Sequence, residues 1–242
     1  MPAAGPFDGD LLDSLNPVQR EAVTHEEGPL LIVAGPGSGK TRVLTSRIAY
    51  LIAKGVSPFE ILAITFTNKA ADEMKQRVAA LVGPVAQKMW VSTFHSACVR
   101  ILRREARHLG YTSSFTIYDQ ADAVRLVGYV LRDQNIDPKK FPPRSVHAVI
   151  SQAKNDLVGV DAYADRARTI YERRIAEVYR EYQSRLRGAN AMDFDDLLTK
   201  TVELFRTCPE VLAHYQTRFK HVLVDEFQDT NPAQNEMVML LG

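Results

Sequence analysis

The octapeptide AGPGSGKT, Ala34 to Thr41, has the residue types and spacing of a phosphate-binding loop. An apolar run precedes it and an amphipathic pattern follows, so the sequence predicts strand, loop and helix over Gly28 to Gly55. Backbone N–H groups of such a loop, together with the helix N-terminus, attract phosphate oxygens. Gly37 and Gly39 permit the torsions that the loop needs, and Lys40 can reach the β- and γ-phosphates of a nucleotide.

Two carboxylates follow a second apolar run near the end of the sequence, in HVLVDEFQDTNPAQ, residues 221 to 234. Alone, this pattern commonly marks a strand that meets solvent. Together with the loop it predicts the other half of an ATP site, because parallel strands end at the ligand-binding edge of an α/β sheet. We expect Asp225 and the Thr41 hydroxyl to hold Mg²⁺, and Glu226 to orient and deprotonate the attacking water.

One residue departs from the usual loop pattern, because Ala34 stands where the first glycine is expected. Gly35 beside it can keep the turn flexible. The alternative is a glycine-rich turn that binds no ligand. The predicted nucleotide-binding loop comprises Ala34, Gly35, Pro36, Gly37, Ser38, Gly39, Lys40 and Thr41.

The elements that must position these residues alternate between strand and helix. ILAITF and WVSTF are predicted strands, and KAADEMKQRVAALVG is a predicted helix with Thr67 or Asn68 as its N-cap. Such alternation indicates a parallel sheet with helices on both faces. Lys40 and Asp225 lie 225 − 40 = 185 positions apart, and residues 111 to 187 are helical in pattern, for example at Tyr171, Ile175, Val178, Tyr182 and Leu186. The fold class predicted is therefore α/β, a P-loop sheet with an inserted all-helical subdomain.

Composition excludes several classes of protein. The 242 residues are 45% hydrophobic and have a net charge of +1, so only local clusters can indicate nucleic acid. Cys98 and Cys208 fit neither a zinc motif nor a disulfide framework. No apolar stretch reaches the length of a membrane helix, and the N-terminus has no export signal. We expect a cytoplasmic protein with no membrane partner.

The motifs, taken in order, resemble those of the UvrD/PcrA/Rep group of superfamily 1 DNA helicases. They are LNPVQREAV at 15 to 23, AGPGSGKTRVL at 34 to 44, TFTNKAADEM at 65 to 74, STFHS at 92 to 96, MDFDDLL at 192 to 198 and VDEFQDTNPAQ at 224 to 234. The resemblance implies the N-terminal part of an ATP-dependent translocase that moves 3′ to 5′ on single-stranded DNA in a bacterial nucleoid, in repair or replication.

The resemblance also implies a division of the chain. Residues 1–110 would be the first part of a RecA-like ATPase domain, 111–190 the inserted helical subdomain, and 191–242 the continuation of the ATPase domain, ending just after the Walker B motif. Gln19 matches the residue that contacts the adenine edge, and Arg42 the residue that lies against the base. Gln228 matches the residue that senses the γ-phosphate, so the implied catalytic set is Lys40, Asp225, Glu226 and Gln228.

Two further strand ends carry residues suited to single-stranded DNA, which the family binds at this edge together with single-strand to duplex junctions. Hydroxyls, amides and imidazoles bond phosphates, and an aromatic ring stacks on a base. The predicted contacts are Phe66, Thr67, Asn68, Thr93 and His95. Core packing is the alternative for Phe66, and a structural histidine for His95. We interpret Asp193 as a cap or an orienting group.

The helix SACVRILRREARHLG places Ala97, Ile101, Leu102 and Leu109 toward one side and Arg100, Arg103, Arg104 and Arg107 toward another. We expect Arg100 and Arg104 to contact DNA. A second basic stretch covers residues 166 to 187. Solvated helix faces are the alternative for both.

The family's second RecA-like domain has no counterpart in these 242 residues, so we expect this chain alone not to unwind DNA. The strand that normally lies between the P-loop strand and HVLVDE is also missing, which predicts a gap or rearrangement in the sheet and exposed apolar edges. The remaining alternatives are the helicase portion of a nuclease-linked relative, a minimal nucleotide-binding module, and a DNA- or protein-binding fragment without turnover. Repair proteins are further expected partners.

Overall fold

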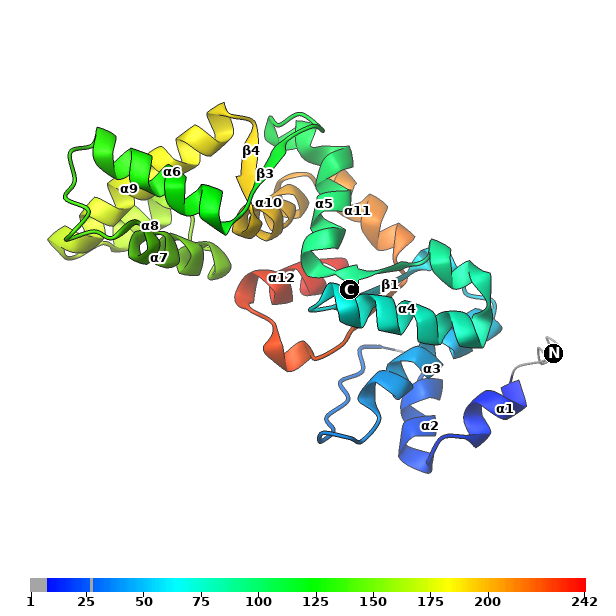
Figure 1. Ribbon diagram of the computed structural model, residues 1–242. Helices are drawn as coiled ribbons and strands as arrows, with labels where there is room; N and C mark the ends of the chain where they lie inside the picture. Colours follow the sequence, from blue (N-terminus) through cyan, green and yellow to red (C-terminus); the bar gives the residue numbers. More distant parts are fainter. Residues whose placement is uncertain (1–7, 27) are drawn as a thin grey trace. The chain divides into compact units, whose positions relative to one another are not determined.

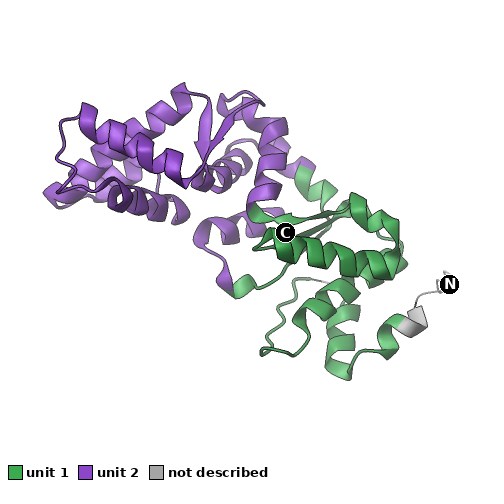
Figure 2. Ribbon diagram, in the orientation of Figure 1, with its two compact units in different colours: residues 1–94, 215–228, 242 green, residues 95–214, 229–241 purple. Residues whose placement is uncertain are grey.

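A computed structural model describes residues 8–26 and 28–242, which form two compact units (Figures 1 and 2). The first takes the chain up to Phe94, Tyr215–Gln228 and Gly242, and the second takes His95–His214 and Asp229–Leu241. Among the described residues, no helix is both long and apolar enough to cross a membrane.

The first unit is built on a parallel sheet in the order β2-β1-β5, confirming the α/β fold class (Figure 1). The strands are β1 (Ile61–Thr65), β2 (Trp90–Thr93) and β5 (His221–Val224). Every residue of β1 is buried, as expected for the central strand of a parallel sheet. Thr65 pairs with Thr93 and Ile64 with Val224, so all three strands end at one edge.

The helices of the first unit pack against this sheet or against one another, and one of them begins at the end of the phosphate loop. They are α1 (Asp8–Asp13), α2 (Pro17–Thr24), α3 (Lys40–Ala53) and α4 (Asn68–Val82), with 3-10 turns η1 (Pro58–Glu60) and η2 (Pro84–Lys88). Ile48 of α3 and Met74 of α4 share a buried cluster with Ile61 and Leu223 of the sheet. Thr67 is the N-cap of α4, its hydroxyl accepting from the N–H of Ala70 at 3.1 Å.

The strand predicted before the phosphate loop is wrong. Leu30–Val33 lies outside the sheet without regular structure, and Leu31 and Val33 are 71% and 88% exposed. An apolar run forms a strand only where a neighbour takes up its N–H and C=O groups, and Pro29 before it has no N–H to donate. The three strands pair directly in the order β2-β1-β5, and the exposed apolar residues lie in the apolar segment Leu30–Val33, outside the sheet.

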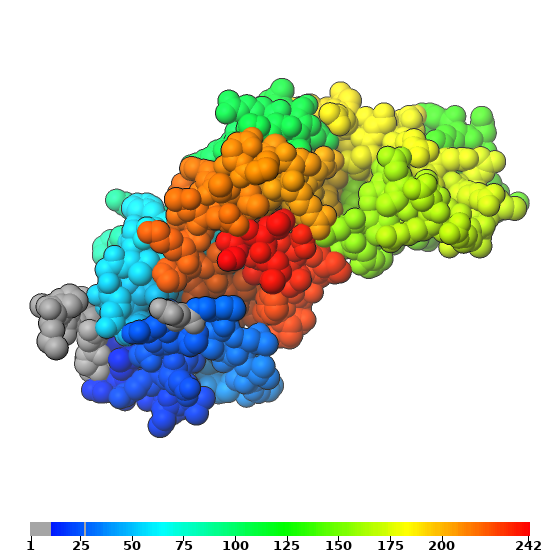
Figure 3. Space-filling view, turned by 180° about the vertical axis from the view of Figure 1, so that it is seen from behind, coloured from blue at the N-terminus to red at the C-terminus, as the bar shows by residue number. Residues whose placement is uncertain are grey.

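The second unit is mainly helical. Its elements are α5 (Phe94–Glu105, beginning one residue before the unit), η3 (Ala106–Leu109), β3 (Thr116–Tyr118), α6 (Gln120–Asp133), α7 (Pro143–Asn155), α8 (Val160–Arg166), α9 (Ile170–Gly188), β4 (Ala191–Asp193), α10 (Phe194–Thr207), the start of α11 (Pro209–Arg218), the end of η4 (Phe227–Asp229) and α12 (Pro232–Leu241). Helices α6, α7 and α9 enclose a hydrophobic core of their own. Helix α12 packs against α10, where Figure 3 shows its red surface beside the orange segment.

Helix α9 confirms most of the predicted helical pattern. Ile175, Val178, Tyr182 and Leu186 are buried in the α6–α7–α9 core. Tyr171 is instead 42% exposed and stacks on Phe141 with ring centroids 4.9 Å apart. The apolar side predicted for α5 and η3 is also buried; it consists of Ala97, Ile101, Leu102 and Leu109.

Two short strands that the sequence pattern does not predict pair with each other, one before and one after this helical region. Strands β3 and β4 pair in parallel, with Thr116 opposite Ala191. Beside them, the N–H of Thr112 donates to Oδ1 of Asn190 at 2.9 Å, and Nδ2 of Asn190 donates to Oγ1 of Thr112 at 2.7 Å. The ends of the region are thus fastened together although 78 positions separate them.

A buried ionic cluster joins α7 to the start of α10. The Lys154 ammonium donates to Oδ2 of Asp193 at 2.7 Å and to Oδ1 of Asp196 at 2.9 Å, and the Tyr182 hydroxyl donates to Asp193 at 2.7 Å. Asp193 is also the N-cap of α10, accepting from the N–H of Asp196. The cap predicted for Asp193 is confirmed, whereas its buried lysine partner is not evident from the sequence.

Candidate nucleotide site and nucleic-acid edge

The phosphate loop ends in the first turn of α3, as its sequence predicts. Gly37 and Gly39 have φ of +75° and +87°, the left-handed region that disfavours a side chain. Ser38 tightens the turn, because its N–H and hydroxyl both donate to the Gly35 carbonyl, at 3.3 and 2.7 Å. The loop therefore presents backbone N–H groups at a helix N-terminus, the arrangement that binds phosphate.

Lys40 is the first residue of α3, and its side chain folds back over the loop. Its ammonium donates to the carbonyls of Ala34 at 3.2 Å and Gly35 at 3.5 Å. Carbonyl oxygens are weaker partners for an ammonium than phosphate oxygens are. Lys40 is therefore placed to exchange these bonds for bonds to a nucleotide.

Gln19 and Arg42 lie beside the same loop. The Gln19 amide donates to the Ser38 carbonyl at 2.9 Å, while its Oε1 accepts from the N–H of Asn16 at 3.2 Å. Asn16 in turn caps α2 by accepting from the N–H of Gln19. Arg42 donates to the Ser14 carbonyl at 2.9 Å, which ties the start of α3 to the segment before α2.

The predicted acids follow β5 directly. Burial and the neighbouring Glu226 carboxylate raise the pKa of Asp225, while the Glu226 N–H and the positive charge of Lys40 act in the opposite direction. Lys40 is thus close enough to influence Asp225 although 185 positions separate them in the chain. Glu226 has φ +53°, an unfavourable backbone conformation for a glutamate, and its carboxylate accepts a hydrogen bond from the Gln228 amide.

The donor set at this site suits magnesium. Thr41 supplies a hydroxyl in the first turn of α3, and Asp225 supplies a carboxylate at the sheet edge. Magnesium prefers hard oxygen ligands. Burial, and after it the Glu226 carboxylate, raise the pKa of Asp225, and a cation here would oppose both effects.

The residues predicted to bind DNA fall in both units. In the first unit, Thr93 is buried at the end of β2, and Thr67 and Asn68 are exposed at the start of α4. Phe66 is half-buried and meets Phe94 edge to face, with ring centroids 5.6 Å apart. This packing occupies one side of the Phe66 ring, as the core alternative predicts, and the ring keeps a partly exposed surface.

In the second unit, His95 is the second residue of the basic helix α5, and its ring packs edge to face with Phe194 at a centroid distance of 5.7 Å. Burial lowers the pKa of His95, and the Asp195 carboxylate opposes that shift. Arg100 and Arg104 are exposed on α5.

Arg103 does not belong with the exposed arginines. Its guanidinium donates to the carbonyls of Ser113 and Phe115 at 2.7 and 2.6 Å and lies over the Phe115 ring. The sequence pattern places Arg103 with its neighbours because helical spacing does not show what packs beside a helix. Its role is to hold the following loop to α5.

Two supporting residues are not among those that motif spacing predicts. Asn16 orients Gln19 through a capping box, and the pattern Asn-Pro-Val-Gln is a recognisable signal for it. The positive charge of Arg77 partly opposes the upward shift in the pKa of Asp225, and nothing in the sequence indicates this interaction.

Comparison with known proteins shows the family to which the chain belongs. Residues 15–242 match the sequence profile described as the UvrD/REP helicase N-terminal domain. The chain is 52% identical over 233 residues to the ATP-dependent DNA helicase PcrA of Bacillus subtilis, covering 96% of this chain and 32% of that protein. It is 54% identical over 242 residues to the ATP-dependent DNA helicase UvrD1 of Mycobacterium tuberculosis, covering 97% of this chain and 31% of that protein.

These 242 residues therefore span about a third of the length of the curated relatives they match. Within that span, the phosphate loop, the acids after β5 and the matched profile lie on the same stretch of chain. The chain belongs to the UvrD/REP helicase N-terminal domain family.

Proposed function

We propose that this chain binds ATP with Mg²⁺ and hydrolyses it in response to single-stranded DNA, as the N-terminal part of a 3′–5′ DNA helicase or translocase. The observation that carries the proposal is the phosphate loop at the N-terminus of α3, where Gly37 and Gly39 have left-handed backbones and the Lys40 ammonium folds back over the loop. The helicase activity named in PcrA and UvrD1 supports it.

The nucleotide is held in this proposal by the phosphate loop and its neighbours. The N–H groups of Gly37 to Lys40 and the Lys40 ammonium bind the phosphates. Gln19, whose amide is already oriented by Asn16, donates to and accepts from the adenine edge. Arg42 has a planar guanidinium suited to stacking on the base, once it leaves the Ser14 carbonyl.

Hydrolysis uses the acids at the sheet edge. Glu226 orients the attacking water and takes its proton, and Gln228, which already bonds to Glu226, links this carboxylate to the γ-phosphate. Thr41 and Asp225 would hold Mg²⁺, which neutralises charge on the phosphates.

DNA binding is proposed at the edge where β1 and β2 end, through Phe66, Thr67, Asn68, Thr93 and His95, with Arg100 and Arg104 on the basic helix. The proposal includes the division into an ATPase part, residues 1–110 and 191–242, and an inserted helical subdomain, residues 111–190. The bonds between Thr112 and Asn190 support a boundary there. We also propose a place with the bacterial nucleoid, and repair proteins as partners.

The test is ATP hydrolysis by the purified chain with and without single-stranded DNA. Lys40→Ala and Glu226→Gln should each lower the DNA-stimulated rate at least about a hundredfold, since each removes transition-state stabilisation or the general base. Lys139→Ala, which removes an exposed lysine from a loop of the second unit, is the charge-matched control and should retain the wild-type rate. Full activity in Lys40→Ala would refute the proposal.

A binding fragment without turnover is the competing function. It predicts that ATP and DNA bind the wild-type chain while hydrolysis stays at the level of Glu226→Gln. Equilibrium binding of a fluorescent ATP analogue, measured beside the rate, separates the two functions.

A further inference from the structure

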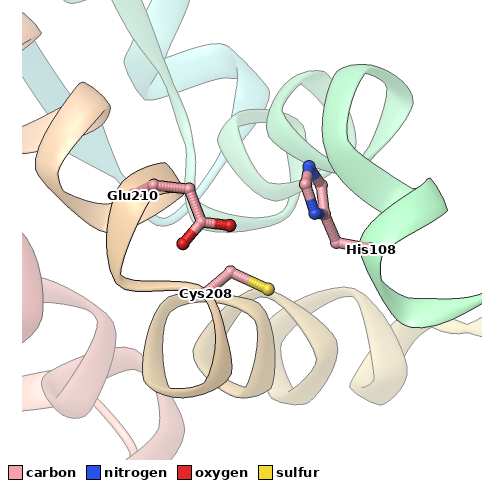
Figure 4. A group of neighbouring side chains, drawn as sticks. All are labelled: His108, Cys208 and Glu210. Atoms are coloured by element: carbon pink, nitrogen blue, oxygen red, sulfur yellow. The ribbon is translucent and has the colours of Figure 1, made fainter.

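A second group of potential metal ligands lies outside the nucleotide site, in the second unit (Figure 4). It consists of His108 in η3, Cys208 between α10 and α11, and Glu210 in the first turn of α11. One donor atom from each lies within 4.8 Å of the other two. In Figure 4 the imidazole, the thiol and the carboxylate face a common space.

We propose that His108, Cys208 and Glu210 form a zinc site. A thiolate, an imidazole and a carboxylate are the ligand types that zinc accepts, and three protein ligands with a water molecule complete a tetrahedral shell. A thiolate also selects against magnesium, which prefers oxygen ligands alone. The site is therefore chemically distinct from the proposed magnesium site at Thr41 and Asp225.

The three ligands are held by rigid backbone. The N–H of Cys208 donates to the Leu204 carbonyl at 2.9 Å, and its own carbonyl accepts from the N–H groups of Val211 and Leu212 at 3.0 and 3.1 Å. On the other side, His108 stands next to Leu109, which anchors η3 in the core. Zinc bonds of about 2.0–2.3 Å place neighbouring ligand atoms about 3.3–3.5 Å apart. The side chains reach this spacing by closing at most about 1.5 Å, within their rotamer freedom.

Glu105 completes the surroundings of the histidine. Its Oε2 lies 3.7 Å from Nε2 of His108. Zinc-bound histidines commonly direct one ring N–H to a carboxylate, which orients the ring and leaves the other nitrogen for the metal. A small side-chain movement would bring Glu105 within hydrogen-bond distance of Nε2, which would leave Nδ1 for the metal.

The other group of potential metal ligands in the described residues is a weaker candidate for a zinc site. His147, Asp193 and Asp195 also lie within 4.8 Å of one another, but Lys154 already neutralises Asp193 at 2.7 Å. An ion there would be repelled by a buried ammonium. The neighbour of His108 is instead the Glu105 carboxylate, 3.7 Å from its Nε2, and a carboxylate favours a cation nearby.

Zinc here would cross-link the chain segments that precede and follow the helical region. His108 and Cys208 lie 208 − 108 = 100 positions apart, one before and one after residues 111–190. A link that closes so long a loop reduces the freedom of the unfolded chain, so metal binding would stabilise this unit.

The decisive experiment uses cobalt as a spectroscopic substitute for zinc. After the chain is stripped with a chelator, added Co²⁺ should give a sulfur-to-cobalt charge-transfer band that Zn²⁺ removes and excess Mg²⁺ does not. Cys208→Ser should abolish the band. The chain has only one other cysteine, Cys98, which is buried in the core, and burial raises the pKa of its thiol to about 12. Cys98→Ala is the matched control and should keep the band.

Affinity measurements complete the test. His108→Ala and Glu210→Gln should weaken Zn²⁺ binding more than about a hundredfold, since even loss of an outer-shell partner costs about 10- to 100-fold. Zn²⁺ should raise the melting temperature of the wild type and not that of Cys208→Ser. Circular dichroism verifies that each variant is folded. Absence of the band in the folded wild type, or its persistence in Cys208→Ser, would overturn the zinc site.

Discussion

Asp225 illustrates, for a single residue, a conflict between stability and chemistry. Its carboxylate is half-buried beside Glu226, and burial and that neighbour raise its pKa above the ordinary value of 3.8. A raised pKa means that the folded state binds the proton more tightly than the unfolded chain does. The resulting stabilisation is complete below pH 3.8 and is lost as the pH rises through the folded pKa.

Replacement of Asp225 by asparagine should therefore stabilise the chain at pH 7 by about 0.5–1 kcal/mol, a typical gain when a functional residue is replaced. The gain over the wild type should shrink as the pH falls through the folded pKa of Asp225 and should vanish below the unfolded value of 3.8. Urea unfolding at several pH values measures both effects. Asp165→Asn, at an exposed position, is the control and should stay within about 0.5 kcal/mol of the wild type. A less stable Asp225→Asn at pH 7 would contradict this account.

A second prediction concerns the contribution of Lys154 to the free energy of unfolding. Burial alone would lower its pKa, but Asp193 and Asp196 outweigh burial and hold the pKa above its usual range. Lys154→Met should lower the free energy of unfolding by about 3–5 kcal/mol, because it leaves buried carboxylates without a counter-charge. Lys139→Met is the exposed control and should change little.

The charge explanation can be separated from simple loss of packing. If uncompensated charge is the cause, adding Asp193→Asn and Asp196→Asn to Lys154→Met should recover much of the lost stability. A triple variant less stable than Lys154→Met would show that packing dominates instead.

At this scale, the sequence predicts chemistry well where local motifs specify it. The loop from Ala34 to Thr41 and the acids after β5 are each contained in a few consecutive residues, so spacing alone places them. Lys154 and Arg103 were not predicted in their roles, because their partners depend on which helices pack together. Long-range interactions of this kind leave no local pattern.

Among the elements, the apolar segment Leu30–Val33 gives the clearest test. Because it is exposed outside the sheet, Leu31→Gln and Val33→Thr should each change the free energy of unfolding by less than about 0.5 kcal/mol. Ile64→Ala in the buried strand β1 should cost about 2–5 kcal/mol. Urea unfolding compares the three variants. A decrease above about 2 kcal/mol for Leu31→Gln would show that this segment is buried in solution.

The same comparison explains which elements the sequence predicts. The helices beside the sheet follow from periodicity, because each buries one face, whereas strands β1, β2 and β5 follow from short apolar runs. Strands β3 and β4 have only three residues each, too few for a periodic signal. The segment before the phosphate loop has the composition of a strand, but strand pairing depends on a neighbour that composition does not reveal.

For the whole molecule, a net charge of +1 makes DNA binding depend on where the charges gather. If Arg100 and Arg104 bind phosphates, Arg100→Ala with Arg104→Ala should lower the slope of log affinity against log salt by about 0.7 for each phosphate interaction removed on single-stranded DNA. Fluorescence anisotropy over a salt series measures the slope. Lys139→Ala is the control for a general reduction of positive charge, and an unchanged slope in the double variant would rule out these phosphate interactions.

The left-handed backbone of Glu226 has a consequence for protein engineering. Glycine at φ +53° relieves strain of about 1–3 kcal/mol, so a search for thermostable variants that scores only the folded chain would favour glycine at this position. That choice would delete the proposed general base. The backbone angle thus marks a position where an engineer optimising heat tolerance would select an inactive enzyme.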